Sequence, residues 1–211
     1  YGVPCAVNFT QAAGAALTDI SAAAKDGTLG VLQGVDIIVT YPHWPRAWQQ
    51  AADWLRLREE GGMTREVISH FLFVSLRILG PLELVWAQPD YPAQSDLCET
   101  HVAARLANQA GLPVTILGSV GGAPPDRQEV TIKGSKTSRR ITDFYRDAVS
   151  SGQNFEPIAA EPHNPRATSL KAQLDDLVLL LAGKPNRLAT LEEALHVQIL
   201  IETILKNHPT N

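Results

Sequence analysis

The chain has 211 residues, enough for one large domain or for one domain with part of another. Hydrophobic residues make up 45% of it and charged residues 19%, which is typical of a globular protein and excludes a disordered tail or a disulfide scaffold. The net charge is −4 and no segment carries a run of five like charges. A nucleic-acid binder would normally carry a concentrated basic face, so we expect no nucleic-acid partner.

Cysteine usage and the N-terminal segment indicate where the protein works. Cys5 and Cys98 fit no metal-binding spacing and favour a reducing compartment, so we expect a cytoplasmic protein with free thiols. Residues 1–18 carry no charge, but Pro4 and Asn8 interrupt them and no basic segment precedes them, so we expect neither a membrane span nor a signal peptide. The chain opens on Tyr1 rather than Met, which suggests that the natural protein extends further at its N-terminus.

The first 41 residues predict a strand, a helix and a second strand. Residues 3–9 form a short apolar run, typical of a buried strand. Residues 12–25 are rich in alanine with a period near 3.6, which predicts a helix that ends at Asp26 and Gly27. Residues 29–41 alternate in polarity and end in β-branched side chains, so they predict a strand that leads into a proline-flanked loop.

Two helices are expected next. The first covers residues 46–59 and is broken by Gly61 and Gly62. Thr64 is a suitable N-cap for the second, which Gly80 and Pro81 end. Its apolar stripe recurs at helical spacing. The stripe consists of Val67, Phe71, Val74 and Ile78.

From Leu82 to about Ala148 the pattern changes to period two. Strand-length runs lie at residues 82–87, 100–107, 113–120, 128–133 and 138–145. We expect strands joined by short links to be antiparallel neighbours, because a parallel crossover needs about a dozen residues or more. A long surface loop is predicted over residues 150–165, followed by two closing helices over residues 169–182 and 190–206.

These elements predict an α+β fold: an open, mostly antiparallel (mixed) sheet of five to seven strands, with four or five helices packed on one face. An antiparallel sheet can leave its other face uncovered. Here that face would carry Thr115, Glu129, Thr131 and Lys133 among apolar residues. We therefore expect it to meet either water or a second copy of the chain.

The strongest local signal for chemistry lies in residues 61–70. The paired glycines allow a positive φ, or a close approach to a ligand, just before a helix begins. Glu66 and His70 lie four residues apart and so share one face of an α-helix. An imidazole beside a carboxylate is a suitable proton donor and acceptor near neutral pH. The alternative is a half-buried structural histidine, with Glu66 paired to Arg65.

Two further segments are candidates for substrate binding. The loop that contains Trp44 and Arg46 offers a ring and a guanidinium group that suit a polyol or an acid, although its prolines and Trp44 could equally close a hydrophobic edge. Thr10 and Gln11 follow the first predicted strand and are the other candidates. We expect no metal site, because the histidines are scattered and the helix with His70 lacks a second one.

The order and spacing of these segments resemble the C-terminal half of the Gfo/Idh/MocA oxidoreductases over nearly the whole chain. Gly61 and Gly62, an acid at Glu66 and His70 precede an Arg-x-Leu-Gly helix end, as in that family. Further similar pieces are residues 25–30, Trp54, Gly134 with Ser135, and the last two helices. The chain departs from the family in four places. Glu66 replaces an Asp, Ile68 a Gly, Phe73 an Asp, and Ala12 with Ala13 replaces bulkier, often basic residues.

The resemblance implies hydride transfer between the nicotinamide of NAD or NADP and a carbon of a sugar, cyclitol or related hydroxyl compound. It implies that His70 is the catalytic acid/base with Glu66 beside it. Residues 1–10 would be the last strand of a missing nucleotide-binding domain, and residues 11–211 the C-terminal substrate and oligomerisation domain. The chain contains neither Gly-x-Gly-x-x-Gly nor Glu-Lys-Pro. We therefore expect the cofactor to be bound mainly by the absent domain and the isolated chain to be inactive.

Two alternatives stay open. The family includes members that bind nucleotide but act as regulators or scaffolds, and Ile68 and Phe73 would fit such a non-catalytic ligand-binding module. The chain could also be a free-standing sugar-binding domain. In the oxidoreductase interpretation we expect a homodimer or tetramer that assembles through the open sheet face, with no membrane contact.

Overall fold

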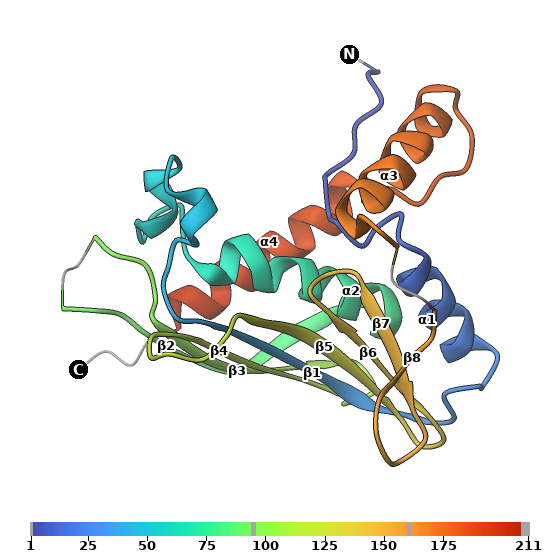
Figure 1. The fold of residues 1–211 in the computed structure, drawn as a ribbon, viewed down its shortest axis with the longest axis horizontal. Helices are drawn as coiled ribbons and strands as arrows, with labels where there is room; N and C mark the ends of the chain where they lie inside the picture. Colours follow the sequence, from blue (N-terminus) through green and yellow to red (C-terminus); the bar gives the residue numbers. More distant parts are fainter. Residues whose placement is uncertain (1, 94–95, 160–161, 208–211) are drawn as a thin grey trace.

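An open β-sheet forms the floor of the structure, and the helices lie on one face of it (Figure 1). The computed structural model describes residues 2–93, 96–159 and 162–207. The strand order is β2-β3-β4-β1-β5-β6-β7-β8, and the expected α+β class with a mixed, mostly antiparallel sheet is confirmed. The strands are β1 (Leu32–Tyr41), β2 (Leu82–Asp90), β3 (His101–Asn108), β4 (Pro113–Val120), β5 (Arg127–Gly134), β6 (Ser138–Thr142), β7 (Arg146–Ser150) and β8 (Glu156–Pro157). The helices are α1 (Ala15–Lys25), α2 (Ser69–Leu79), α3 (Pro165–Leu181) and α4 (Leu191–Lys206).

Strand β1 makes the sheet mixed. It pairs parallel with β4, with Ile37 opposite Ile116, and antiparallel with β5, with Ile37 opposite Val130. The other named pairings are antiparallel. The expectation that every short link joins neighbours is wrong for β4 and β5, because β1 lies between them. The link between these two strands begins against the end of β1, where the Gly121 amide donates to the Tyr41 carbonyl at 2.8 Å.

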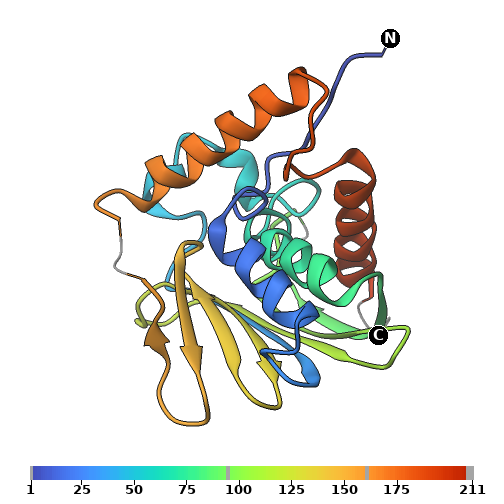
Figure 2. The ribbon, with the colours of Figure 1, turned by 90° about the vertical axis from the view of Figure 1, so that its right-hand side faces the viewer.

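Helix α2 lies at the centre of the helical layer. Its residues Phe71, Leu72, Phe73 and Val74 are fully buried, so the helix is covered on nearly every side and not only along the predicted stripe. It packs on α1 and on α4, while α3 stands away from the sheet (Figures 1 and 2). Among the described residues, no helix is both long enough and apolar enough to span a bilayer.

Residues 3–9 do not form the predicted strand. Val7 makes one isolated antiparallel bridge, to Ala189, and Val3 is 69% exposed. A short apolar run becomes a strand only where a neighbour supplies a ladder of hydrogen bonds. Here the neighbouring segment pairs at a single residue.

The predicted helix over residues 46–59 is also wrong. The segment forms two 3-10 turns, Ala47–Gln49 and Asp53–Arg56. Trp44 Nε1 donates to the Leu55 carbonyl at 2.9 Å, and the Cys98 amide donates to the Arg56 carbonyl at 2.8 Å. Groups distant in sequence thus take carbonyls that a continuous α-helix would use.

The edge of the sheet contains more strands than the sequence predicts. The run over residues 138–145 ends as a strand at Thr142, and Asp143 and Phe144 then adopt φ values of 49° and 66°. The chain turns back there into β7, and β8 lies inside the predicted loop over residues 150–165. A left-handed conformation is costly for a bulky residue such as Phe144 and commonly marks a functional site.

Two arginines fasten the ends of the central helical segment to α4. Arg77 donates to both carboxylate oxygens of Glu193, at 2.8 and 2.9 Å, and also to the carbonyls of Arg187 and Ala12. Arg65 makes the equivalent bidentate pair with Glu202, at 2.7 and 3.0 Å. Bidentate guanidinium–carboxylate pairs fix geometry as well as adding stability. They hold α2 in one position against α4.

Replacing Arg77 tests this role. We expect Arg77→Met to lower the free energy of unfolding by about 1–3 kcal/mol, because Glu193 and several carbonyls lose their donor in a half-buried place. Urea unfolding followed by circular dichroism measures the change. The control is Lys171→Met, whose exposed pair with Asp175 should contribute less than about 0.5 kcal/mol. Equal effects of the two substitutions would contradict the fastening role.

Candidate functional site

The segment before α2 begins with a π-helical turn, Thr64–Ile68. Gly62 has a φ of +99°, and an added Cβ would collide with the carboxylate of Glu99. That carboxylate accepts a hydrogen bond from the Thr64 amide at 2.8 Å, so it satisfies one of the free N–H groups at the helix start. Burial raises the pKa of Glu99. Of the glycine pair, Gly62 therefore does adopt a positive φ, and its close neighbour is a side chain of the same protein.

His70, in the first turn of α2, is half-buried. Its Nδ1 accepts a hydrogen bond from the Thr10 amide at 3.2 Å. Phe9 and Phe144 lie edge-on to the ring, with centroids 5.5 and 5.6 Å away. The chain thus brings three separate segments to the imidazole: the turn after residue 9, the turn between β6 and β7, and α2 itself.

The environment of His70 disfavours its charged form. Burial lowers the pKa of His70 to about 4, and the nearby positive charge of Arg46 adds to the effect. A lowered value means a neutral imidazole at neutral pH. The sequence pattern predicted the opposite influence, a carboxylate that supports the charged form.

Glu66 faces another set of partners. Its carboxylate accepts a hydrogen bond from Gln49 Nε2 at 2.9 Å and lies 3.6 Å from the Arg46 guanidinium. In the described part of the chain it makes no hydrogen bond to His70. The spacing rule fails because the π-helical turn does not have α-helical geometry. Burial raises the pKa of Glu66, and Arg46 opposes that shift.

Arg46 is enclosed by aromatic rings. Its guanidinium carbon lies 5.4 Å from the ring centroid of Tyr41, 5.6 Å from Trp44 and 4.7 Å from Trp48. Its Nε donates to Gln49 at 2.8 Å. Trp44 packs against the core and holds the loop through its bond to Leu55, which agrees with the interpretation that it closes a hydrophobic edge. Tyr41 is fully buried, and burial raises the pKa of its hydroxyl.

A cavity of about 720 Å³ lies between the start of α1, the β6–β7 edge of the sheet and the start of α3. Thr10, Gln11 and Phe144 line it, and two of these three residues contact His70. Gln11 is 3% exposed, and neither of its amide atoms has a hydrogen-bond partner among the described residues. A buried amide without partners costs free energy, so this side chain is an energetic liability next to the cavity.

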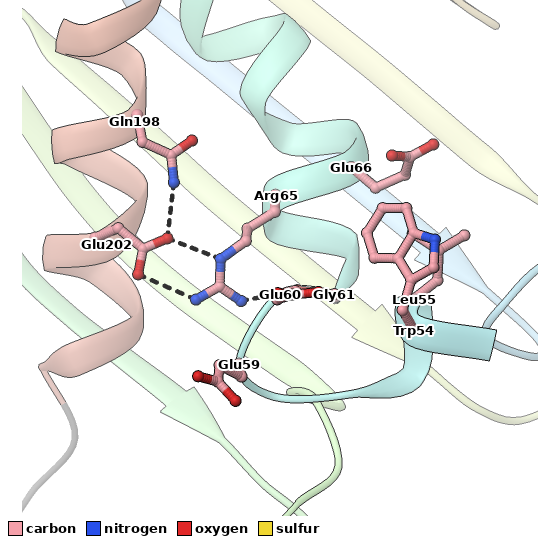
Figure 3. Close-up of a pocket in the computed structure, with 10 residues that line it drawn as sticks. Trp54, Leu55, Glu59, Glu60, Gly61, Arg65, Glu66, Gln198 and Glu202 are labelled. Carbon is pink, nitrogen blue, oxygen red and sulfur yellow. Dashed lines mark hydrogen bonds and ion pairs between the residues drawn. The ribbon is translucent and has the colours of Figure 1, made fainter. Parts of the chain in front are cut away.

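A smaller cavity of about 410 Å³ lies between residues 54–66 and α4 (Figure 3). Arg65 bonds Glu202 and the Gly61 carbonyl there, while Glu66 points away from this ion pair. The alternative in which Glu66 pairs with Arg65 is therefore wrong. Glu59 and Glu60 add exposed carboxylates at the rim of this cavity.

The candidate residues thus form two groups. Thr10 and Gln11 line the larger cavity, and His70 contacts two of its lining residues, Thr10 and Phe144, whereas Glu66, Arg46 and Trp44 form a network at the loop after β1. Arg46 connects the groups through its charge. Three further residues of the site could not be predicted from the sequence. Phe9, Gln49 and Phe144 lie on the misassigned strand, the misassigned helix and an unpredicted turn, so the local pattern carried no signal for them.

The described residues do not fit a nicotinamide dinucleotide. Such a cofactor needs a glycine-rich turn between a strand and a helix. Gly30 has a positive φ and lies directly against Ser135 and Lys136, and Gly118 packs against Val102 inside β4. In residues 2–93, 96–159 and 162–207 no group of three or more His, Cys, Asp or Glu could hold a metal ion. Cys5 and Cys98 are free, as predicted.

The lowered pKa of His70 predicts a pH-dependent stability. Below the ordinary value of 6.5 the unfolded chain takes up a proton at this residue, whereas the folded chain does so only near 4. The wild type should therefore lose stability relative to His70→Gln as the pH falls from about 6.5 toward 4. Above pH 6.5 this contribution to stability should be fully present. We expect a difference of about 1–2 kcal/mol between about pH 7.5 and pH 5.

Urea unfolding of both proteins at each pH gives this value. Subtracting the free energy of unfolding of the variant from that of the wild type cancels the contributions of other titrating groups. Among these are three carboxylates with raised pKa values, which stabilise the fold as the pH falls: Glu66, Glu99 and Asp147. Parallel pH dependences of the wild type and the variant would contradict a neutral, buried imidazole.

Comparison with known proteins identifies the fold. No protein-family model and no curated protein sequence matches the chain. Among solved structures, the WlbA dehydrogenase from Bordetella pertussis, in complex with NADH and UDP-GlcNAcA, matches with a TM-score of 0.71 and 20% identity, over 95% of this chain and 61% of that one. A super-repressor mutant of Gal80p from Saccharomyces cerevisiae matches with a TM-score of 0.78 and 12% identity, over 98% and 63%. The 3-ketoreductase KijD10 from Actinomadura kijaniata, in complex with TDP-benzene and NADP, gives 0.71 and 14%, over 98% and 62%.

These matches confirm the predicted resemblance at the level of the fold. The chain has the fold of the C-terminal part of Gfo/Idh/MocA-type oxidoreductases and spans about three fifths of the length of the structures that it matches. The TM-scores of 0.71–0.78 establish the shared fold. At sequence identities of only 12–20%, the activity has to be argued from the site.

Proposed function

We propose that this chain is the substrate-binding part of an NAD(P)-dependent oxidoreductase that acts on a sugar, cyclitol or related hydroxyl compound by hydride transfer. The observation that carries the proposal is the cavity beside His70. It lies in a fold shared with a dehydrogenase that binds NADH and a 3-ketoreductase that binds NADP. Gln11 lines this cavity, and its amide group has a donor and an acceptor that no described residue engages, which suits hydroxyl groups.

The cofactor in this proposal is held by a separate nucleotide-binding domain, because the described residues do not fit a dinucleotide. The residues of this chain then have binding and orienting roles. Gln11 and Thr10 contact the substrate in the cavity, and His70 meets the oxygen at the reacting carbon. Glu66 and Trp44 hold the loop that carries Arg46, and the Arg46 charge acts on the imidazole.

The test is turnover of NAD(P)H by the chain joined to its nucleotide-binding domain, with candidate polyols and the corresponding ketones as substrates. We expect His70→Ala to lower kcat/KM by about 100-fold, the loss typical of one hydrogen bond to a reacting oxygen. His101→Ala is the control, because His101 is exposed on β3. Unchanged turnover in His70→Ala would contradict the role proposed for His70.

A non-catalytic ligand-binding module is the second candidate. Two observations favour it: Glu66 is bound by Gln49 and Arg46 instead of supporting the imidazole, and the fold is shared with a super-repressor mutant of Gal80p. Calorimetric titration of the same polyols into the joined protein, with NAD(P)H absorbance read in parallel, separates the two functions. A regulator binds its ligand without consuming the cofactor.

We also propose that the uncovered sheet face forms a homodimer or tetramer. Leu117 lies on the inner strand β4, is 51% exposed and points away from the helices, since the adjacent Gly118 faces Met63 and Ile68. We expect Leu117→Glu to dissociate the assembly, because it would bury a charge between two sheets. Sedimentation velocity measures the change, with Leu174→Glu on α3 as the matched exposed control. A monomeric wild type would contradict the proposal.

A further inference from the structure

The two ring nitrogens of His70 have different surroundings. Nδ1 receives the amide proton of Thr10 at 3.2 Å. Nε2 makes no hydrogen bond to the described residues. The atom is not fully buried, so it keeps contact with solvent. The ring is therefore occupied by the protein at one nitrogen and open at the other.

A nitrogen that accepts an N–H hydrogen bond carries no proton of its own. In a neutral imidazole the single proton must then reside on the other nitrogen. The Thr10 amide is a backbone group and cannot reverse its role, unlike a hydroxyl or a carboxylate that could either donate or accept. The contact therefore selects one tautomer of the ring.

The groups around the ring oppose a second proton. Phe9 and Phe144 lie edge-on to it and are uncharged, and Arg46 is the charged side chain that acts on it from outside its own helix. Glu66, on the helical segment that carries His70, is engaged by Arg46 and Gln49. Burial and the Arg46 charge agree in lowering the pKa of His70.

We propose that Thr10 is a positioning residue whose backbone amide locks His70 as the neutral Nε2–H tautomer, and that His70 acts as a fixed hydrogen-bond donor to a ligand oxygen and does not transfer protons. Loss of the Nε2 proton would leave an imidazolate anion, since Nδ1 is already unprotonated. Gain of a proton at Nδ1 would break the bond to Thr10. The role at a reacting oxygen rests on the proposed function, whereas the tautomer itself does not.

The position of Thr10 in its turn provides a selective test. The Ala12 amide donates to the Phe9 carbonyl at 2.9 Å, so residues 9–12 form a β-turn with Thr10 at its second position. Proline is favoured at that position and has no N–H. Thr10→Pro therefore removes the donor to Nδ1 while it keeps a residue suited to the turn. Thr10→Ala is the matched control, since it keeps the backbone amide and loses only the side-chain hydroxyl and methyl group.

The measurement is a long-range ¹H–¹⁵N correlation spectrum of the histidine rings in the intact chain, followed across pH, with the His70 signals assigned by their loss in His70→Gln. In the wild type and Thr10→Ala we expect only the Nε2–H form, with no titration around the ordinary pKa of histidine. In Thr10→Pro we expect a measurable population of the Nδ1–H form and a pKa that moves up toward its ordinary value.

An Nδ1–H form in the wild type, ordinary titration of the wild-type ring, or a Thr10→Pro spectrum identical to that of Thr10→Ala would each overturn the proposal. If Thr10→Pro does not fold, the wild-type spectrum alone still decides between the tautomers. These results need no cofactor or substrate, so they stand apart from the turnover test. In the joined protein, a limb of the kcat/KM profile near the ordinary pKa of histidine that vanishes in His70→Gln would also overturn the donor role.

Discussion

Helix α2 lies between α1 and α4 with four consecutive side chains, from Phe71 to Val74, fully buried, and a helix covered in this way needs partners for every polar group at its ends. The structure supplies them from distant parts of the chain. Glu99 accepts the Thr64 amide where the helical segment begins, and Arg77 connects the last turn to Glu193 and to the N-terminal segment. Because these partners fix α2 in position and rotation, they also fix where His70 can meet other residues.

The turn at residues 9–12 is held by the same helix. Phe9 stacks on Phe73 with ring centroids 4.5 Å apart. The Arg77 guanidinium lies over the Phe73 ring, 4.5 Å from its centroid. Ser169 Oγ donates to the Thr10 carbonyl and so connects the turn to α3. The Thr10 amide is therefore presented to His70 by a segment that is itself anchored at several points. This explains how a single backbone group can orient a half-buried imidazole.

The sequence predicts the parts of this fold that depend on local periodicity. The runs that became β3, β4 and β5 alternate because one face of the sheet is buried, and α4 begins with a capping box formed by Thr190 and Glu193. The candidate site was only partly predictable. The position of His70 on a helix was correct, but its actual partner lies 60 residues away, and the group that caps its helical segment lies 35 residues from Thr64. A π-helical turn has no local signature in the sequence. The four-residue spacing of Glu66 and His70 therefore predicted an α-helical pairing that the structure does not contain.

The separation of Glu66 from His70 bears on what this site can do. A carboxylate hydrogen-bonded to an imidazole would orient it and support its protonated form, which suits proton transfer. Here the acid is engaged by Arg46 and Gln49, and the charge of Arg46 acts on the imidazole to disfavour its protonated form. A cation beside a neutral donor favours negative charge developing on a ligand oxygen, because both groups are arranged before the ligand arrives. The same arrangement would also bind a carbonyl or hydroxyl oxygen without any reaction. The proposed enzyme and the proposed ligand-binding module would therefore use the imidazole in the same way, as a hydrogen-bond donor to a ligand oxygen.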